Sequence, residues 1–234
     1  MALVSVSVLP EVDKLFARPQ NYTREQLTGI ARINADPSML VVRADAPWKT
    51  LKDMLEAAKK EPGKIRVGSP GVGTTVHIAI EILKDKAGVD LTHVPFAGNA
   101  ESVPALLGGH VEAIMLHPSD VIPHMRAGKA RFLATSETRR STVYPDVPTF
   151  AEQGLAEAGI GVYYIVIAPK ATPAPVLQTV HDAIKKTIET DAFKKFALET
   201  SALVEYRGPA ELKKQLETEY VFFGRVVEKL KLKR

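Results

Sequence analysis

A run of glycines and hydroxyl side chains is the part of this sequence best suited to chemistry. It reads Ser69-Pro70-Gly71-Val72-Gly73-Thr74-Thr75, after an apolar stretch at Ile65–Val67 that predicts a short strand and before a segment with helical periodicity. The first turn of a helix presents backbone N–H groups that have no intrahelical acceptor, and glycine lets a ligand approach the main chain. The pattern therefore predicts a site for a small anion.

Two more loops follow predicted strands in the same way. Ala97–Ala100 comes after the strand Leu91–Val94, and His117–Ser119 comes after the strand Val111–Leu116. Ligands of open parallel sheets bind outside the carboxyl ends of the strands, so the three loops are expected at one edge. Helix capping is the competing explanation, because Ser, Thr and Asn are common N-cap residues.

Other chemistries that use these residue types have little support. The glycine run lacks the lysine of G-x-x-x-x-G-K-[ST], and it lacks the third glycine and the later acidic residue of a dinucleotide site. The chain has six histidines, but neither an H-E-x-x-H pair nor a G-x-S-x-G elbow. His77 is expected to pack or cap, and His93 to lie in the core or rim of a strand. We predict no catalytic residue, no metal site and no cofactor, and hence no enzyme.

The amino-acid composition excludes further classes of function and site. A net charge of +4 comes from scattered lysines, and only 6% of residues are aromatic, so nucleic-acid binding is not favoured. The absence of cysteine excludes disulfides and thiolate metal sites. No apolar run approaches the roughly 20 residues of a membrane span, and the apolar start reads as a strand rather than a signal peptide.

The order of predicted elements indicates an α/β fold. Between Thr50 and Thr135 strands and helices alternate, which predicts a parallel sheet with helices on both faces. The turn-rich stretch Glu137–Gly161 is expected to connect two lobes. The other predicted elements are a strand at Leu3–Leu9, an extended segment at Ile30–Arg43, a strand at Val162–Ala168, and helices at Pro173–Thr190, at Ala192–Thr200 and from Pro209 onward.

Five collinear motifs carry a resemblance to a known family. They cover nearly the whole chain and are similar to the substrate-binding proteins of tripartite tricarboxylate transporters, called TctC or Bug proteins. The motifs are Lys64–His77, His93-Val94-Pro95-Phe96-Ala97-Gly98, Leu106–Val111 with Pro123–Lys129, Tyr144–Phe150, and Ile167–Pro173.

The resemblance implies a two-lobed, type II periplasmic-binding-protein-like fold with parallel or mixed sheets. It divides the chain into a first-lobe remnant and crossover at 1–39, a second lobe at 40–162, and a return strand with C-terminal helices at 163–234. It also implies an extracytoplasmic protein that captures a small carboxylate (a di- or tricarboxylate or an aromatic acid) for transporter subunits in the membrane. Neither nucleic acid nor direct membrane insertion is expected.

The resemblance assigns ligand-binding residues to several positions. The loop residues of the bottom-up anion site coincide with the family's carboxylate site. Tyr163 falls where the family often has an aromatic residue, and two serines match the end of a first-lobe strand that faces the cleft. The complete expected set is Ser69, Gly71, Gly73, Thr74, Thr75, Gly98, Asn99, Ala100, Ser5, Ser7 and Tyr163.

The sequence also departs from the family pattern. The Pro-Gly-Gly and Asn-Arg-Pro-Gly loops of the family are missing, so we expect an incomplete first lobe with exposed apolar surface. Leu116-His117-Pro118 stands where the family often has an acidic or small polar residue. The alternatives are a degenerate protein or cytosolic sensor module of the same fold, and an enzyme that binds phosphate at the glycine–threonine loop.

Overall fold

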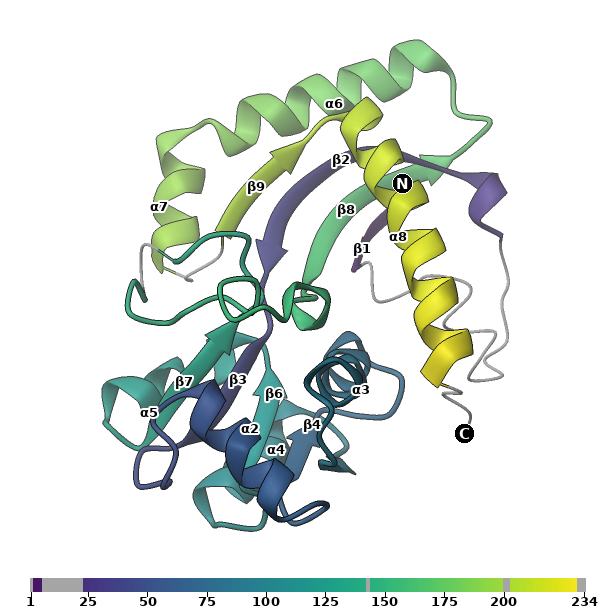
Figure 1. The fold of residues 1–234 in the computed structure, drawn as a ribbon. Coiled ribbons are helices and arrows are strands. Elements are labelled where there is room, and N and C mark those ends of the chain that lie inside the picture. Colours follow the sequence, from purple (N-terminus) through teal and green to yellow (C-terminus); the bar gives the residue numbers. More distant parts are fainter. Residues whose placement is uncertain (1, 6–22, 142–143, 200–202, 231–234) are drawn as a thin grey trace. The chain divides into compact units, whose positions relative to one another are not determined.

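The computed structural model describes residues 2–5, 23–141, 144–199 and 203–230. These residues form two compact units. Unit 1 consists of Met1–Asp36 and Val162–Arg234, and unit 2 of Pro37–Gly161. Each unit contains its own sheet, and the two are described separately (Figure 1).

Unit 2 contains a five-stranded mixed sheet in the order β5-β4-β6-β3-β7. Strand β4 pairs in parallel with β5 and with β6, whereas β3 is antiparallel to both β6 and β7. The strands are short and largely apolar, as expected for strands covered on both faces. Their bounds are β3 Met39–Arg43, β4 Arg66–Ser69, β5 Thr92–Pro95, β6 Ala113–Leu116 and β7 Ala130–Thr135.

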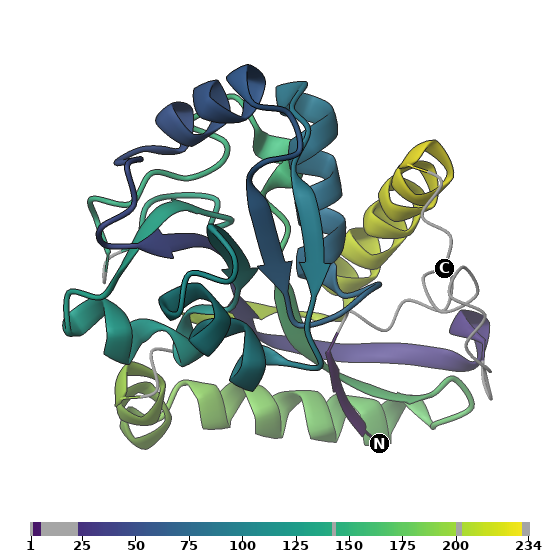
Figure 2. The ribbon, with the colours of Figure 1, turned by 90° about the horizontal axis from the view of Figure 1, so that it is seen from below.

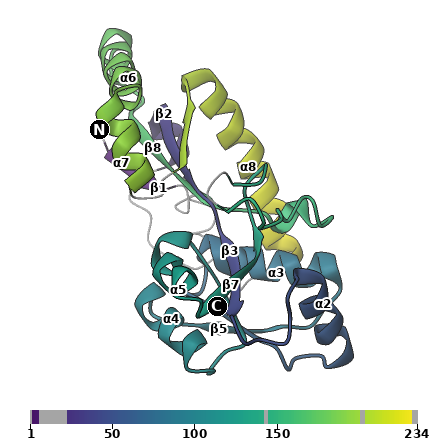
Figure 3. The same cartoon turned by 90° about the vertical axis from the view of Figure 1, so that its left-hand side faces the viewer.

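Helices lie on both faces of this sheet (Figure 3). Helix α4 contributes Val103 and Leu106 to a core that also contains Val41 and Ile114. Helix α2 begins at a capping box between Thr50 and Asp53, a common helix start signal. The helices are α2 Leu51–Lys60, α3 Thr75–Ala87, α4 Asn99–Leu107 and α5 Ile122–Arg126, with 3-10 turns at Pro118–Asp120 and Ala156–Ala158.

Unit 1 contains a four-stranded sheet in the order β1-β8-β2-β9. All three described pairings are antiparallel. Strand β8 lies in the middle and carries the apolar run that the sequence predicted as a strand. The bounds are β1 Ala2–Ser5, β2 Leu27–Asp36, β8 Val162–Pro169 and β9 Leu203–Arg207.

Two helices cover opposite faces of β2. Ile30 packs with Leu177 and Val180 of α6, which runs along the strand (Figures 1 and 2). The neighbouring residue, Gly29, faces α8. A Cβ at Gly29 would lie 2.7 Å from Leu212 of α8, so β2 and this helix approach closely because Gly29 has no side chain. The helices are α6 Ala174–Ile188, α7 Asp191–Glu199 and α8 Pro209–Leu230, with a 3-10 turn at Arg24–Gln26.

The structure corrects three expectations about secondary structure. The unit 2 sheet is mixed rather than parallel, because β3 runs against its neighbours. Leu203–Arg207 is a strand that periodicity did not reveal. The stretch 137–161 is part of unit 2, where Phe150 is fully buried, rather than a free connection. The first strand is described only at Ala2–Ser5, and the rest of the predicted Leu3–Leu9 lies outside the described residues.

Candidate functional site: the loop at the N-terminus of helix α3

The loop between β4 and α3 is held in shape by its own hydroxyl groups. The Oγ of Ser69 is fully buried, lies 2.7 Å from Nε2 of His93, and accepts the N–H of Gly71 at 3.3 Å. Thr74 is the N-cap of α3, and its Oγ1 donates to the carbonyl oxygen of Gly71 at 2.9 Å. That Oγ1 also accepts the N–H of His77 at 3.3 Å. The predicted capping role of these hydroxyls is therefore real, and it fixes the loop.

Two backbone donors remain at the start of α3. Thr74 occupies the N–H of His77 through its side chain and the N–H of Ile78 through its carbonyl oxygen. Within the described part of the chain, the N–H groups of Thr75 and Val76 have no hydrogen-bond acceptor. Free donors at the positive end of a helix dipole favour an anion, because both the hydrogen bonds and the dipole stabilise negative charge there.

The second predicted loop lies directly beside the first. Ser69 and Pro95 are partners in the parallel pairing of β4 and β5, and the N–H of Phe96 donates to the carbonyl oxygen of Ser69 at 2.9 Å. Gly98 is then the N-cap of α4, which begins at Asn99 and continues through Ala100. The prediction that the two loops share one edge of the sheet is confirmed.

The third predicted loop begins at the same edge, after β6. His117 is the N-cap of a 3-10 turn, and its Nδ1 lies 3.2 Å from the carbonyl oxygen of Pro37. This contact ties the loop to the start of β3. The side chain of His117 thus has a structural role, but it makes no cap hydrogen bond, and α5 begins after Val121 rather than at a cap on Ser119, so capping is not the explanation here.

Two histidines are packed behind the Ser69–Thr75 loop. The rings of His77 and His93 stack with their centroids 4.0 Å apart, and Nδ1 of His77 accepts the N–H of Gly73 at 3.1 Å. Burial is the main cause that lowers the pKa of both rings, and it brings the pKa of His93 to about 4. Both rings are therefore uncharged at neutral pH. The described residues contain no group of three or more His, Cys, Asp or Glu that could hold a metal ion.

The predicted residues of unit 1 have different surroundings. Tyr163 is 6% exposed, and its hydroxyl donates to the carboxylate of Glu219 while the guanidinium of Arg32 lies 4.5 Å from its ring centroid. Burial, followed by the charge of Glu219, raises the pKa of Tyr163 far above its ordinary value. Ser5 pairs with Tyr164 in the register of β1 and β8, and Ser7 lies outside the described residues.

Sequence reasoning missed the polar network around Tyr163. The side chain of Arg32 is 7% exposed, and its Nη2 lies 2.7 Å from Oε2 of Glu205. Gln215 accepts hydrogen bonds from Arg32 at 3.3 Å and from Arg207 at 3.0 Å. The available signal was an arginine in the otherwise apolar stretch Ile30–Ile33, because a buried arginine requires acidic or amide partners.

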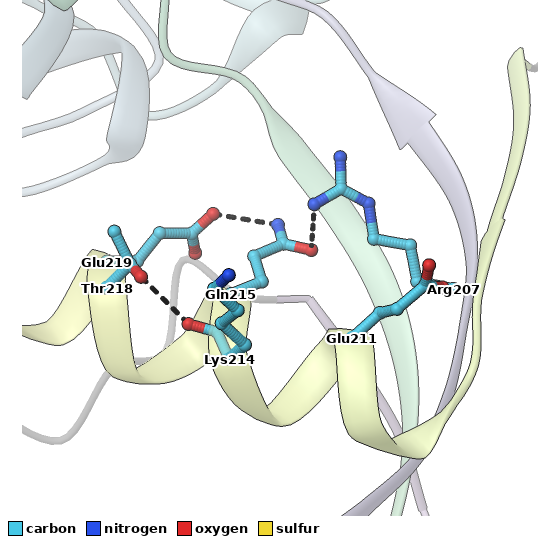
Figure 4. A pocket seen from close by; sticks show the side chains of 6 residues that line it. All are labelled: Arg207, Glu211, Lys214, Gln215, Thr218 and Glu219. Carbon is cyan, nitrogen blue, oxygen red and sulfur yellow. Dashed lines mark hydrogen bonds between the residues drawn. The ribbon is translucent and has the colours of Figure 1, made fainter.

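A groove of about 400 Å³ lies beside this network (Figure 4). Gln215 links its two ends, accepting from Arg207 and donating to Glu219 at 2.7 Å. Three of the lining side chains, Arg207, Gln215 and Glu219, are thus part of the polar network of unit 1. The lining residues are Arg207, Glu211, Lys214, Gln215, Thr218 and Glu219.

The fold is similar to those of solved solute-binding proteins. A TctC solute-binding protein from Polaromonas superposes with a TM-score of 0.83 at 29% identity, covering 97% of this chain and 77% of that one. MatC from Rhodopseudomonas palustris, solved with bound malate, gives a TM-score of 0.77 at 25% identity, covering 96% of this chain and 78% of that one.

The sequence comparisons identify the family. The profile described as "Tripartite tricarboxylate transporter family receptor" (TctC) matches residues 1–232, and the chain belongs to this family. The "UPF0065 protein in gbd 5'region" of Cupriavidus necator is 42% identical over 159 residues, which are 66% of this chain and 47% of that protein. The chain spans about half the length of the curated relatives it matches.

Family membership tests some of the expectations that were drawn from the sequence. The resemblance to TctC and Bug proteins is confirmed, as is the mixed α/β fold. The family is one of solute-binding proteins rather than enzymes. The residue assignments and the division at 1–39, 40–162 and 163–234, with an incomplete first lobe, stay predictions. None of the helices in the described part of the chain combines the length and apolar character that a membrane crossing requires.

Acidification is expected to destabilise the folded protein through His93. Its pKa is about 4 in the folded protein against an ordinary 6.5, so the unfolded chain takes up the proton first. The free energy of unfolding should fall as the pH drops through this range, by at most about 1.4 kcal/mol per pH unit for this group, and stop falling near the lower value. Urea unfolding of the wild type and His93→Gln measures the difference. Equal pH slopes for both proteins would contradict this prediction.

Replacing Arg32 tests the polar network of unit 1. Arg32→Met keeps apolar volume but removes the bonds of Arg32 to Glu205 and Gln215, which then keep Arg207 as a donor. We expect it to lower the free energy of unfolding by about 2 kcal/mol. Lys213→Met is the matched control, since Lys213 forms an exposed pair with Glu217 on α8 at 4.0 Å. Its expected effect is below about 0.5 kcal/mol. Equal losses for the two variants would show that the network contributes no more than a surface pair.

Proposed function

We propose that this protein binds a small carboxylate at the N-terminus of α3. The observation that carries the proposal is the pair of free donors, the N–H groups of Thr75 and Val76, in a loop fixed by its own side chains. A rigid set of donors binds an anion without a further ordering cost, because the loop is already in its bound shape. TctC family membership and the malate in MatC support a carboxylate rather than a phosphate.

The internal bonds of the loop divide its residues into two roles. The hydroxyls of Ser69 and Thr74 and the N–H groups of Gly71 and Gly73 hold the loop. We propose that the ligand's carboxylate accepts the N–H groups of Thr75 and Val76 together with the hydroxyl of Thr75. Residues Gly98–Ala100 form the adjacent wall, which is supported by the pairing of Ser69 with Pro95.

A panel of acids tests the ligand class. Malate, succinate, citrate and benzoate are compared with malamide and dimethyl malate, which keep the size of malate but carry no carboxylate. A ligand at 100 times its Kd stabilises the folded state by about 2.7 kcal/mol, a shift that thermal unfolding detects easily. We expect at least one acid to stabilise the protein and both neutral analogues to have no effect. A folded sample that no acid stabilises would contradict the proposal.

A proline at the first position of α3 tests the proposed donors. Thr75→Pro removes one free N–H, and proline is well tolerated at this position because that N–H has no intrahelical partner. Thr74 has an extended backbone with ψ of 159°, the conformation that a following proline requires. We expect Thr75→Pro to weaken acid binding by about tenfold or more, the loss of a charge-assisted hydrogen bond.

Thr75→Val is the matched control, because it removes the hydroxyl and keeps the N–H. We expect it to bind more tightly than Thr75→Pro, with circular dichroism confirming that both variants fold. Wild-type affinity in Thr75→Pro would rule out the N–H of Thr75 as a ligand donor and move the site elsewhere.

We also propose that the bound acid is delivered to membrane subunits of a tripartite transporter outside the cytoplasm. The family description supports this role, since it names a transporter receptor. The direct test is binding of the acid-loaded protein to reconstituted membrane subunits. We expect the acid to strengthen that association. Association that is equally strong with and without acid would contradict a delivery role.

A further inference from the structure

Two stacked histidines connect both ends of the Ser69–Thr75 loop to the body of unit 2. Nε2 of His93, on β5, lies 2.7 Å from Oγ of Ser69 at the start of the loop. Nδ1 of His77, on α3, accepts the N–H of Gly73 at 3.1 Å near the end of the loop. The rings stack at 4.0 Å with 23° between their planes, so each histidine also supports the other.

The protonation state of His77 is fixed by its partner. The backbone N–H of Gly73 can only donate, so Nδ1 of His77 must offer a lone pair and the ring must be uncharged. Gly73 has a φ of +76°, a conformation that favours glycine, and the hydrogen bond helps to hold it. A proton on Nδ1 would place two N–H groups against each other and break this contact.

The protonation state of His93 is constrained by the charge of the neighbouring ring rather than by the direction of its hydrogen bond. The hydroxyl of Ser69 can donate or accept, so it tolerates either form of the ring. Two positive charges on rings stacked 4.0 Å apart would nevertheless repel each other, because the two rings are largely buried. Protonation of both rings is therefore incompatible with the described arrangement.

The charged groups that act on the two rings lie on α3. Glu81 raises and Lys84 lowers the pKa of His77, both after burial, and Lys84 also lowers the pKa of His93. Glu81 and Lys84 form an ion pair with each other at 3.0 Å. Among the described residues of the neighbouring elements, residues 67–76 and 94–100 have no ionisable side chain. The charged side chains of these elements have partners of their own: Arg66 pairs with Glu112 at 2.6 Å, Glu157 with Lys86 at 2.7 Å, and Glu101 accepts the N–H of Ala97 at 3.1 Å.

We propose that His77 and His93 are positioning residues of the ligand-binding loop, which hold it in the described conformation only while the ring of His77 is uncharged, with the ring of His93 stacked against it. The effect on ligands rests on the proposed carboxylate function, whereas the effect on the loop does not. Acidification would then release the loop and weaken acid binding through these two side chains. Burial, which lowers the pKa of both histidines, places that release on the acidic side of neutrality.

Two substitutions separate the titration from the contacts. His77→Asn places an amide oxygen where Nδ1 accepts, and His93→Gln places a polar group where Nε2 meets Ser69, but neither amide titrates. His110→Asn is the matched control, because His110 is an exposed histidine of the same unit. The proteins to compare are the wild type, the double variant His77→Asn/His93→Gln, and the control.

The first measurement uses the ligand-free protein and follows the backbone amide signal of Gly73 by NMR between about pH 7 and about pH 3.5, together with the ring signals of both histidines. In the wild type and in the control we expect the Gly73 amide to shift with the histidine titration. In the double variant it should stay constant. A Gly73 signal that ignores histidine titration in the wild type would overturn the inference.

The second measurement is malate affinity at the same two pH values. Titration of malate itself is common to all the proteins, so only differences between them count. We expect the wild type and His110→Asn to lose about tenfold more affinity on acidification than the double variant does. Equal losses in all three proteins would overturn the inference. If Gly73 follows the histidines but no acid from the panel binds at any pH, the positioning role is supported and the carboxylate function is contradicted.

Discussion

The backbone donors at the start of α3 impose the constraint on which the candidate site depends. A helix leaves its first N–H groups without intrahelical acceptors, and each one needs a partner from a side chain, from water or from a ligand. In α3 the N-cap Thr74 supplies partners to the N–H groups of His77 and Ile78, and those of Thr75 and Val76 remain. The bonds of Ser69, Thr74 and His77 to Gly71 and Gly73 fix the loop that leads into these two donors.

The two units differ in the hydrogen bonding of their polar groups. In unit 1, Arg32, Glu205 and Gln215 are bonded to one another, and Tyr163 is bonded to Glu219. Arg207, Gln215 and Glu219 of this network also line the groove of about 400 Å³ along α8. In unit 2 the hydroxyls of Ser69 and Thr74 have partners in the loop and on β5, whereas two backbone donors have no acceptor among the described residues. The proposed anion site rests on the second arrangement and not on the first.

Much of unit 2 could be predicted from the sequence because its signals are local. The alternation of apolar strands with loops rich in Gly, Ser and Thr predicted that Ser69–Thr75 and Gly98–Ala100 would share an edge, and the pairing of Ser69 with Pro95 places them there. The sequence could not assign roles within the loop. Capping and ligand binding use the same residue types, and only the bond from Thr74 to Gly71 distinguishes them.

Features that depend on distant residues could not be predicted. Strand β9 was missed because Leu203–Arg207 alternates weakly and becomes a strand through pairing with β2. The stacking of His77 on His93 joins a helix to a strand, and periodicity within either element says nothing of it. The same holds for Arg32, whose partners lie more than 170 residues away along the chain.

The most direct test of this account is an NMR titration of the folded protein with malate or the most stabilising acid of the panel. The account predicts that the backbone amide protons of Thr75 and Val76 move downfield and saturate together, because both donate to one carboxylate. Saturable acid binding that leaves these two amide signals unchanged would contradict it.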